Sequence, residues 1–241
     1  MELYKISFIR RIVVIVRAYF FVKVLKRLKT AYSHDAFQIT VQHNLKGLYQ
    51  CNNRMNLLIQ PLVSLEKINT DSKILIIGPR NEHDLFLLRA HGFRMGNIVG
   101  LDLITYSPFI RIGDMHKMEF ENNTFDAVIL GWTLSYSSEP QKAIEEIIRV
   151  TKNGGIVAVA VEYSNLNKSD SQKLLAYSVQ DYEKLGKRIN STHQILELFS
   201  EKIAHIFFNH DAPLKRHHTP ENFIKNVSSV AVIVEIEKYD L

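Results

Sequence analysis

The sequence lacks most of the features that reveal an activity directly. It contains one cysteine, Cys51, so it can form no internal disulfide and no cysteine-based metal site. It contains no P-loop, no Gly-x-Ser-x-Gly turn and no Cys-x-x-Cys pair, which leaves NTPase, serine hydrolase and dithiol redox activities without support. Internal repeats and low-complexity tracts are absent too. With so little cysteine, we expect a protein of a reducing, cytoplasmic compartment.

The N-terminal segment also lacks a long hydrophobic run. None of its apolar runs exceeds five residues before a charge, whereas a membrane span needs about 20 apolar residues. Arg17 interrupts the stretch that a cleaved signal peptide would keep apolar. Residues 1–35 carry eight Lys and Arg against Glu2 and Asp35, and the rest of the chain is nearly neutral. The net charge of +5 therefore does not predict a nucleic-acid-binding domain.

Apolar residues in the same segment recur at steps of three and four, which predicts one face of a helix. The members of this stripe are Ile6, Ile9, Val13, Val16, Phe20, Val24 and Leu28. Arg10, Arg17 and Arg27 fall on or near it. Two interpretations are open for residues 1–29. One is a basic amphipathic helix lying on the anionic inner face of a membrane, and the other is a helix docked on its own domain or on a partner subunit.

We expect three regions, a basic helical leader, a helical lead-in and an α/β domain, over residues 1–35, 36–69 and 70–241. In the lead-in, helices are predicted around His43–Gln50 and Met55–Val63, with a kink or break at Pro61. We expect the lead-in to cover one edge of a sheet and to carry no chemistry.

The third region alternates short apolar runs with helical patterns, which is typical of a parallel sheet buried on both faces. The predicted strands are Lys73–Ile77, Asn97–Leu101, Phe125–Leu130 and Ile156–Val161, and the predicted helices are Glu82–His91 and Gln141–Val150, the second stopped by the glycines of Lys152–Gly155. Further helices are predicted around Leu174–Leu185 and Ile195–Phe199, and a final antiparallel strand pair at Ile203–Phe208 and Ser229–Glu237. The expected fold class is α/β: a doubly wound, Rossmann-like, mostly parallel sheet with an antiparallel C-terminal strand and an N-terminal helical extension.

The connection after the second strand is unusually short. Only ten residues separate Asp102 from Gly113, whereas a parallel crossover that contains a helix needs a dozen or more. We therefore expect the helix of this crossover to be reduced to a turn, and the next strand to be short or lost.

Residues 70–163 resemble the class I S-adenosylmethionine-dependent methyltransferases. The resemblance rests on Asp126-x-Val128 at the start of a strand, on the helix of Ala143–Val150 and on the turn Lys152–Gly155. It is nearest to the small-molecule branch typified by the ubiquinone-biosynthesis methyltransferases. It implies a methyltransferase fold, S-adenosylmethionine as the cofactor, and methyl transfer to a small or carrier-linked metabolite.

The resemblance also implies a role for each matching position. The turn at Gly78 would pack against the methionine part of the cofactor, Asp102 would hold the ribose hydroxyls, and Asp114 with Met115 would contact the adenine. A carboxylate at a strand end can accept both hydrogen bonds of a ribose diol, and a glycine lets the backbone approach a ligand closely. The expected cofactor-binding residues are Gly78, Pro79, Arg80, Asp102, Asp114, Met115 and Gly131. The candidates for catalysis or acceptor contact are Trp132, Tyr136 and Glu162, and no catalytic role is assigned among them.

Two departures from the family pattern are visible. The turn Gly78–Glu82 has one glycine where the family usually has three, and Pro79 removes an amide donor. The short crossover would leave the adenine side of the pocket more open, or covered by another segment such as the leader.

Each candidate residue also has a structural explanation. Asp102 and Asp114 suit loop solvation or helix capping. Arg80 could pair with the cofactor's carboxylate or an acceptor phosphate, or lie on the surface. Trp132 and Tyr136 could instead be core or rim aromatics, and His116 could be a solvated loop histidine. The pairs His210-Asp211 and His217-His218 match no recognised ligand spacing, so no metal site is predicted.

Three functions remain open at this point. The first is methyl transfer from S-adenosylmethionine. The second is a non-catalytic protein of the same fold that binds another anionic ligand or scaffolds a partner, and the third is a peripheral membrane component that positions a partner through its leader. Gly131–Leu134 stands where enzymes that methylate amino groups of nucleic-acid bases carry an Asn-Pro-Pro-aromatic run, which argues against methylation of those amino groups, and no nucleic-acid partner is expected.

Overall fold

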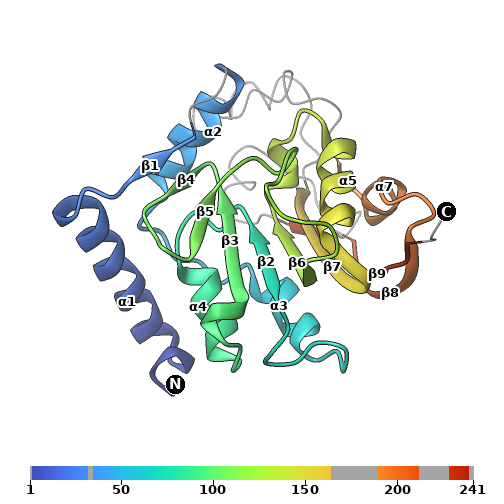
Figure 1. Cartoon of the computed structure of the whole chain (residues 1–241), viewed down its shortest axis with the longest axis horizontal. Helices are drawn as coiled ribbons and strands as arrows, with labels where there is room; N and C mark the ends of the chain where they lie inside the picture. The colour runs from blue at the N-terminus through green and yellow to red at the C-terminus, as the bar shows by residue number, and fades with distance from the viewer. Residues whose placement is uncertain (1, 32–34, 164–188, 212–227, 239–241) are drawn as a thin grey trace.

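A seven-stranded sheet forms the centre of the computed structural model, which describes residues 2–31, 35–163, 189–211 and 228–238 (Figure 1). In spatial order the strands are β5 (Ile110–Ile112), β3 (Ile98–Asp102), β2 (Ile74–Ile77), β6 (Phe125–Gly131), β7 (Thr151–Tyr163), β9 (Ser228–Ile236) and β8 (Ile203–His210). Strands β5 to β7 run parallel, and β9 is antiparallel to both β7 and β8. The expected doubly wound sheet with an antiparallel C-terminal pair is confirmed.

Helices cover both faces of this sheet, as its apolar, buried central strands β2 and β6 require. On one face lie α3 (Asn56–Val63) and α4 (His83–Ala90), and on the other α5 (Pro140–Val150) and α7 (Thr192–Glu197). All four residues of β2 are buried, which places this strand at the centre of the core. The carboxyl ends of β2, β3 and β6 therefore open at one edge of the sheet, flanked by helices.

The short crossover after β3 contains no helix, as expected. It consists of the two-residue strand β4 (Ile104–Thr105), a turn and the three-residue strand β5. β4 pairs antiparallel with β1 (Lys29–Thr30) at the end of the leader, and Ala31 donates a backbone hydrogen bond to Leu103. The leader thus covers the side of the sheet that the missing helix leaves open.

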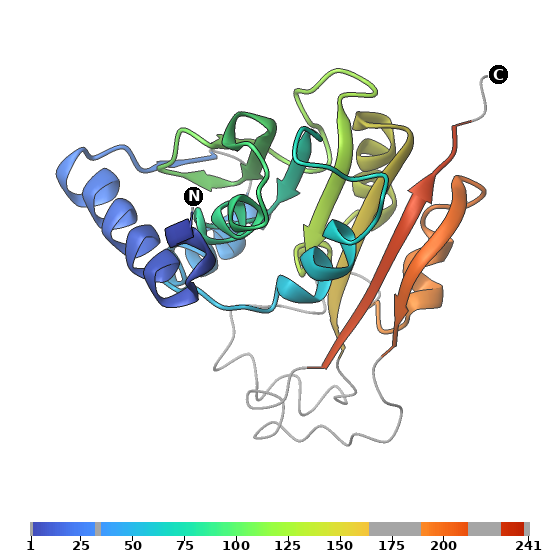
Figure 2. The same cartoon turned by 90° about the horizontal axis from the view of Figure 1, so that it is seen from below.

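The leader is helical, and it docks on its own chain. It comprises the 3-10 turn η1 (Glu2–Lys5), α1 (Ser7–Tyr19) and a π-helical turn η2 (Phe20–Val24). In Figures 1 and 2, α1 lies at the edge of the molecule, and its contacts are with α4. The inward face is not the predicted apolar stripe: the buried side chains of α1 are Arg10, Val14 and Ala18.

Several sequence-based boundaries need correction. The first lead-in helix, α2, spans Asp35–Lys46 rather than residues 43–50, and α3 continues through Pro61 to Val63 without a break. Gly154 does not stop α5: that helix ends at Val150, and Gly154 lies within β7 at a φ of 71°. The helix predicted at Leu174–Leu185 lies outside the described residues. Among the residues described, no helix has both the length and the apolarity to span a membrane.

Candidate functional site

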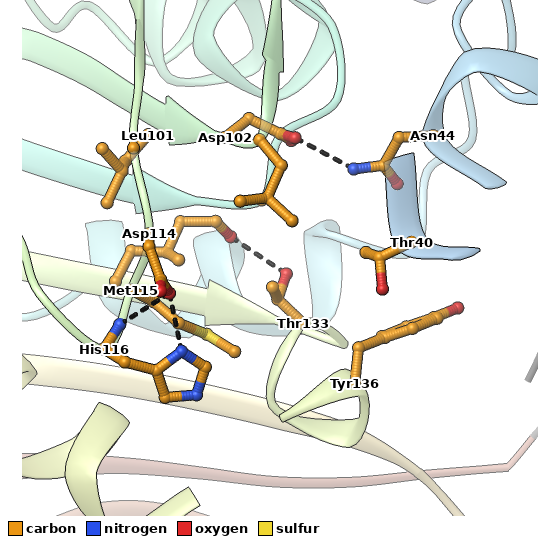
Figure 3. A pocket seen from close by; sticks show the side chains of 13 residues that line it. Thr40, Asn44, Leu101, Asp102, Asp114, Met115, His116, Thr133 and Tyr136 are labelled. Carbon is orange, nitrogen blue, oxygen red and sulfur yellow. Dashed lines mark hydrogen bonds and ion pairs between the residues drawn. The ribbon is translucent and has the colours of Figure 1, made fainter. Parts of the chain in front are cut away.

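A pocket opens at the carboxyl ends of β2, β3 and β6, where the sequence predicts a ligand site (Figure 3). It is partly open to solvent, and its empty space, counted together with the solvent at its mouth, is about 450 Å³. Its lining combines strand-end residues with two residues of α2: Thr40, Asn44, Ile77, Gly78, Leu101, Asp102, Leu103, Gly113, Asp114, Met115, His116, Thr133 and Tyr136. Two carboxylates and several apolar side chains therefore share one cavity.

Asp102 ends β3 and is only 4% exposed. Its Oδ1 accepts hydrogen bonds from Asn44 Nδ2 at 2.9 Å and from the Ile104 amide at 3.2 Å, and its Oδ2 accepts one from the Arg80 amide at 2.7 Å. Burial raises the pKa of Asp102, and these hydrogen bonds oppose the rise. One acceptor position on Oδ2 remains for a ligand among the contacts that the structure describes.

Asp114 lies across the pocket, in the loop after β5. Its Oδ1 accepts hydrogen bonds from His116 through the backbone amide at 2.9 Å and the ring Nδ1 at 2.6 Å. Partial burial raises the pKa of Asp114, but the His116 hydrogen bonds lower it by more, so it lies below its ordinary value. Asp114 is therefore an ionised acceptor at neutral pH. His116 is 7% exposed, so the expectation of a solvated loop histidine is wrong.

The turn after β2 keeps the backbone shape of a glycine-rich loop with only one glycine. Gly78 has a φ of 73°, and Arg80, two residues later, has a φ of 58°, a conformation that costs a non-glycine residue free energy. A Cβ at Gly78 would lie 2.1 Å from Thr133 Oγ1, so only glycine fits beside Thr133. The Arg80 guanidinium lies against Gly47, after α2, so a side chain at Gly47 would displace it.

A second, polar pocket lies on the other side of Gly78. It is lined by Gln50, Asn52, Arg54, Met55, Gly78, Pro79, Arg80, Asn81, His83, Asp84 and Gly131. Burial raises the pKa of Asp84 to about 7, even though Arg54, Arg80 and Arg10 each lower it. Burial likewise lowers the pKa of His83 to about 4, so its ring is neutral. Two arginines and a carboxyl group thus face one small cavity.

The seven predicted cofactor-binding residues lie around these two pockets. Asp102, Asp114 and Met115 line the first pocket, Pro79, Arg80 and Gly131 line the second, and Gly78 lines both. The structure therefore brings these seven positions together at one edge of the sheet, and their roles in cofactor binding stay a prediction.

The three acceptor-side candidates have different surroundings. Tyr136 lines the first pocket, and its hydroxyl lies 3.5 Å from His43 Nε2. Trp132 is 2% exposed with Arg54 stacked 4.7 Å above its ring, and Glu162 forms a 3.1 Å ion pair with the same Arg54. Neither of these last two lines the pocket, so only Tyr136 is placed to touch a ligand there.

The lead-in contributes more to the site than the sequence suggests. Asn44 and Thr40 line the first pocket, Arg54 lines the second, and His43 contacts Tyr136. Burial and the nearby Arg80 charge lower the pKa of His43, so its imidazole is neutral at pH 7. The lead-in therefore lies at both pockets, and whether it takes part in any chemistry is not tested by these contacts. No motif marks these positions, because they reach the site only through the packing of α2 and α3.

No group of three or more metal-ligating side chains occurs among the described residues. Asp211 instead accepts hydrogen bonds from the amide and hydroxyl of Thr192 at 2.8 Å each, which fixes the start of α7. His217 and His218 lie outside the described residues.

Comparison with known proteins gives matches over part of the chain. Residues 85–159 match the family model described as a methyltransferase domain. The chain is 45% identical over 53 residues to demethylmenaquinone methyltransferase of Renibacterium salmoninarum, a match that covers 22% of each protein. It is 32% identical over 92 residues to a ubiquinone/menaquinone biosynthesis C-methyltransferase of Ruegeria sp., covering 38% of this chain and 36% of that protein. The matches thus span about a fifth to a third of these relatives.

Among solved structures, a chain of a Haloferax volcanii complex that contains a methyltransferase activator aligns with a TM-score of 0.57. The alignment covers 86% of this chain and 98% of that chain, at 18% sequence identity. At this identity the match shows a likeness in fold alone. The fold of this chain is the Rossmann-like fold of methyltransferases, and its residues 85–159 match a methyltransferase domain in sequence.

Proposed function

We propose that the chain transfers a methyl group from S-adenosylmethionine to a small or carrier-linked metabolite. The observation that carries the proposal is the pairing of Asp102 and Asp114 across one pocket that opens beside Gly78. One carboxylate suits a ribose diol, and the other suits the exocyclic amine of adenine. The apolar Leu101 and Met115 between them suit the faces of a purine.

The residues present fit an adenosyl group with one adjustment. Asp102 Oδ2 has room for one more hydrogen bond, but Oδ1 already accepts from Asn44 and from the Ile104 amide. A ribose that presents two hydroxyls therefore competes with the Asn44 amide. Because Asn44 belongs to α2, a small shift of that helix would release it. We expect Asn44→Ala to tighten cofactor binding severalfold, since the carboxylate is then freed of its competitor.

The polar pocket suits the amino-acid end of the same cofactor. Arg54 and Arg80 offer guanidinium groups to a carboxylate. Because Arg54 is also engaged with Glu162, Arg80 is the arginine more available to a ligand. With this assignment, a turn with one glycine can still bind the cofactor. The Arg80 side chain takes the place of the backbone contacts that the missing glycines would allow.

The bound cofactor supplies an electrophilic methyl group on a sulfonium, so the protein needs mainly to align the acceptor with it. Tyr136 lines the pocket from the acceptor side. His43, neutral and within reach of the Tyr136 hydroxyl, can take up a proton from an acceptor that must lose one. The names of the matched relatives support a quinone-type acceptor and methylation at carbon.

Calorimetric titration with S-adenosylhomocysteine tests this function. The expected result is micromolar binding, about −8 kcal/mol, that Asp102→Ala abolishes. Thermal unfolding of the variant checks that it is folded. Absence of binding to the folded native chain would contradict the proposal and favour the non-catalytic alternative.

The exposed side chains of the leader support a second proposed partner, the surface of an anionic membrane, which the leader would contact without crossing it. Ten large apolar side chains on the leader are between 41% and 70% exposed: Leu3, Ile6, Phe8, Ile12, Ile15, Val16, Tyr19, Phe20, Val24 and Leu25. Exposed basic residues, Lys23, Lys26, Arg27 and Lys29, follow directly along the chain. Apolar insertion together with basic charge provides the two signals that peripheral attachment needs.

Sedimentation with vesicles tests this contact without deleting the leader, whose inner face packs on α4. Ile15→Ser should reduce binding to vesicles that contain phosphatidylserine, and Ile206→Ser is the matched control, because both side chains are 41% exposed. Binding should weaken with added salt. Equal binding of the two variants would contradict the proposed contact.

A further inference from the structure

His116 links the cofactor side of the pocket to the acceptor side. Its ring Nδ1 lies 2.6 Å from Asp114 Oδ1, and its ring Nε2 lies 2.7 Å from Ser137 Oγ. Ser137 directly follows the 3-10 turn η4 (Leu134–Tyr136), which carries Tyr136 into the pocket. The imidazole therefore spans the two loops that the proposed function assigns to adenine and to the acceptor.

The hydrogen-bond directions along this chain follow from its carboxylate end, because Asp114 Oδ1 can only accept a hydrogen from His116 Nδ1. The Glu139 amide donates to Ser137 Oγ at 3.1 Å, so the Ser137 hydroxyl can donate onward to His116 Nε2. The ring hydrogen then sits on Nδ1 and is donated to Asp114. This tautomer is assigned from the hydrogen-bond network, in which every donor has an acceptor.

These hydrogen bonds determine which carboxylate oxygen of Asp114 can accept from a ligand. Both His116 hydrogen bonds end on Oδ1, and no hydrogen bond from the described residues ends on Oδ2. The side chain is 34% exposed, and it lies at the pocket wall (Figure 3). With Oδ1 held, the carboxylate is fixed in rotation, and Oδ2 remains as an acceptor for a donor on the ligand.

We propose that His116 and Ser137 are positioning residues that aim Asp114 at the exocyclic amine of adenine. They thereby make the site selective for adenine over a purine that carries oxygen at that position. This inference rests on the proposed cofactor. The three side chains do not form a nucleophilic triad, because Ser137 is 3% exposed and does not line the pocket.

The test compares the affinities of S-adenosylhomocysteine and S-inosylhomocysteine, which differ at this one position of the base. The native chain should prefer the adenosyl compound by about tenfold or more, because a carboxylate accepts from an amine and repels a carbonyl oxygen. Ser137→Ala should reduce that preference below about threefold, although Ser137 touches neither ligand. Ser138→Ala is the matched control, since Ser138 is its exposed neighbour.

A second variant separates positioning from a general loss of structure. The shorter amide of His116→Asn can keep the bond to Asp114 but cannot reach Ser137, so its preference should match that of Ser137→Ala. The double variant should lose no more than either single one, because both break the same link. Thermal unfolding should show that all variants remain folded.

The outcomes distinguish this inference from the function on which it rests. If the native chain binds neither compound, the proposed function fails and this inference fails with it. If the native chain binds S-adenosylhomocysteine but Ser137→Ala keeps the full native preference for adenine, the positioning role alone is overturned.

Discussion

Helices α1 and α5 are both strongly amphipathic, yet only α5 buries its main apolar face. α5 buries its apolar side, with Ala143, Ile144, Ile147 and Val150 against the sheet. α1 buries Arg10, Val14 and Ala18 and leaves Phe8 70% exposed. Amphipathic periodicity therefore predicts that a helix has two unlike faces, but it does not show which one turns inward.

The difference has an electrostatic cause in α4. Glu82, at the start of α4, is fully buried and requires a charge partner. Arg17 of α1 supplies it through two hydrogen bonds, at 2.7 and 2.9 Å, and its guanidinium stacks near Phe21, Phe86 and Phe109. This pairing sets the rotation of α1. On α5, Glu146 and Arg149 pair with each other and bond the loop that contains Met118 and Phe120, so no buried charge has to be met by the inward face of this helix.

The largest expected effect is the difference in unfolding free energy between truncating a buried isoleucine in α5 and truncating an exposed isoleucine in α1. Ile147→Ala in α5 should lower the free energy of unfolding by about 4 kcal/mol, because a fully buried isoleucine leaves a cavity. Ile15→Ala in α1 should change it by less than about 0.5 kcal/mol, since that side chain is exposed. Urea unfolding measures both. Equal losses would show that the outward face of α1 is buried in solution.

The next effect concerns the ion pair of Arg17 and Glu82, which joins α1 to the start of α4. Arg17→Ala leaves the buried Glu82 carboxylate without its partner and should cost about 2–3 kcal/mol of unfolding free energy, reduced from the value for a fully buried pair because Arg17 is partly exposed. Adding Glu82→Gln should restore part of this loss, because the amide is neutral. Additive losses in the double variant would indicate that the pair does not orient α1.

A further effect is a pH dependence at Asp84 of α4, which lines the polar pocket and is also affected by the charge of Arg10 in α1. Asp84 has a pKa of about 7 when folded, against about 3.9 in an unfolded chain. The folded state alone holds this proton between those values, so stability should fall as the pH rises from about 4 to about 7. Asp84→Asn should flatten this part of the profile. Arg54 and Arg80 lower the pKa of Asp84 most, and Arg10 on the inward face of α1 lowers it further, so Arg10→Ala should extend the fall in stability to higher pH. An Arg10→Ala profile identical to that of the native chain would contradict the described placement of α1.

The sheet could be predicted from the sequence because its signals are local. Apolar runs mark the buried strands, and the ten residues between Asp102 and Gly113 are too few for a helical crossover. Two local rules failed. Pro61 stays inside α3, and Gly154 lies within β7 rather than ending α5, so proline and glycine did not decide these boundaries.

The site could be predicted only in part, for the same reason. Asp102, Asp114 and Gly78 follow strands directly, so sheet topology alone brings them together. Asn44 and Arg54 reach the site through the packing of distant helices, and His116 is buried through its bond to Ser137. Such contacts leave no periodic or motif signal in the sequence.

A crystal structure with S-adenosylhomocysteine bound would test the account most directly. We predict the ribose at Asp102, the adenine at Asp114, and the bond from Asn44 Nδ2 to Asp102 Oδ1, 2.9 Å in the free protein, broken in the complex. A ligand bound elsewhere, or a complex in which Asn44 still holds Asp102 and no ribose lies beside it, would contradict the account.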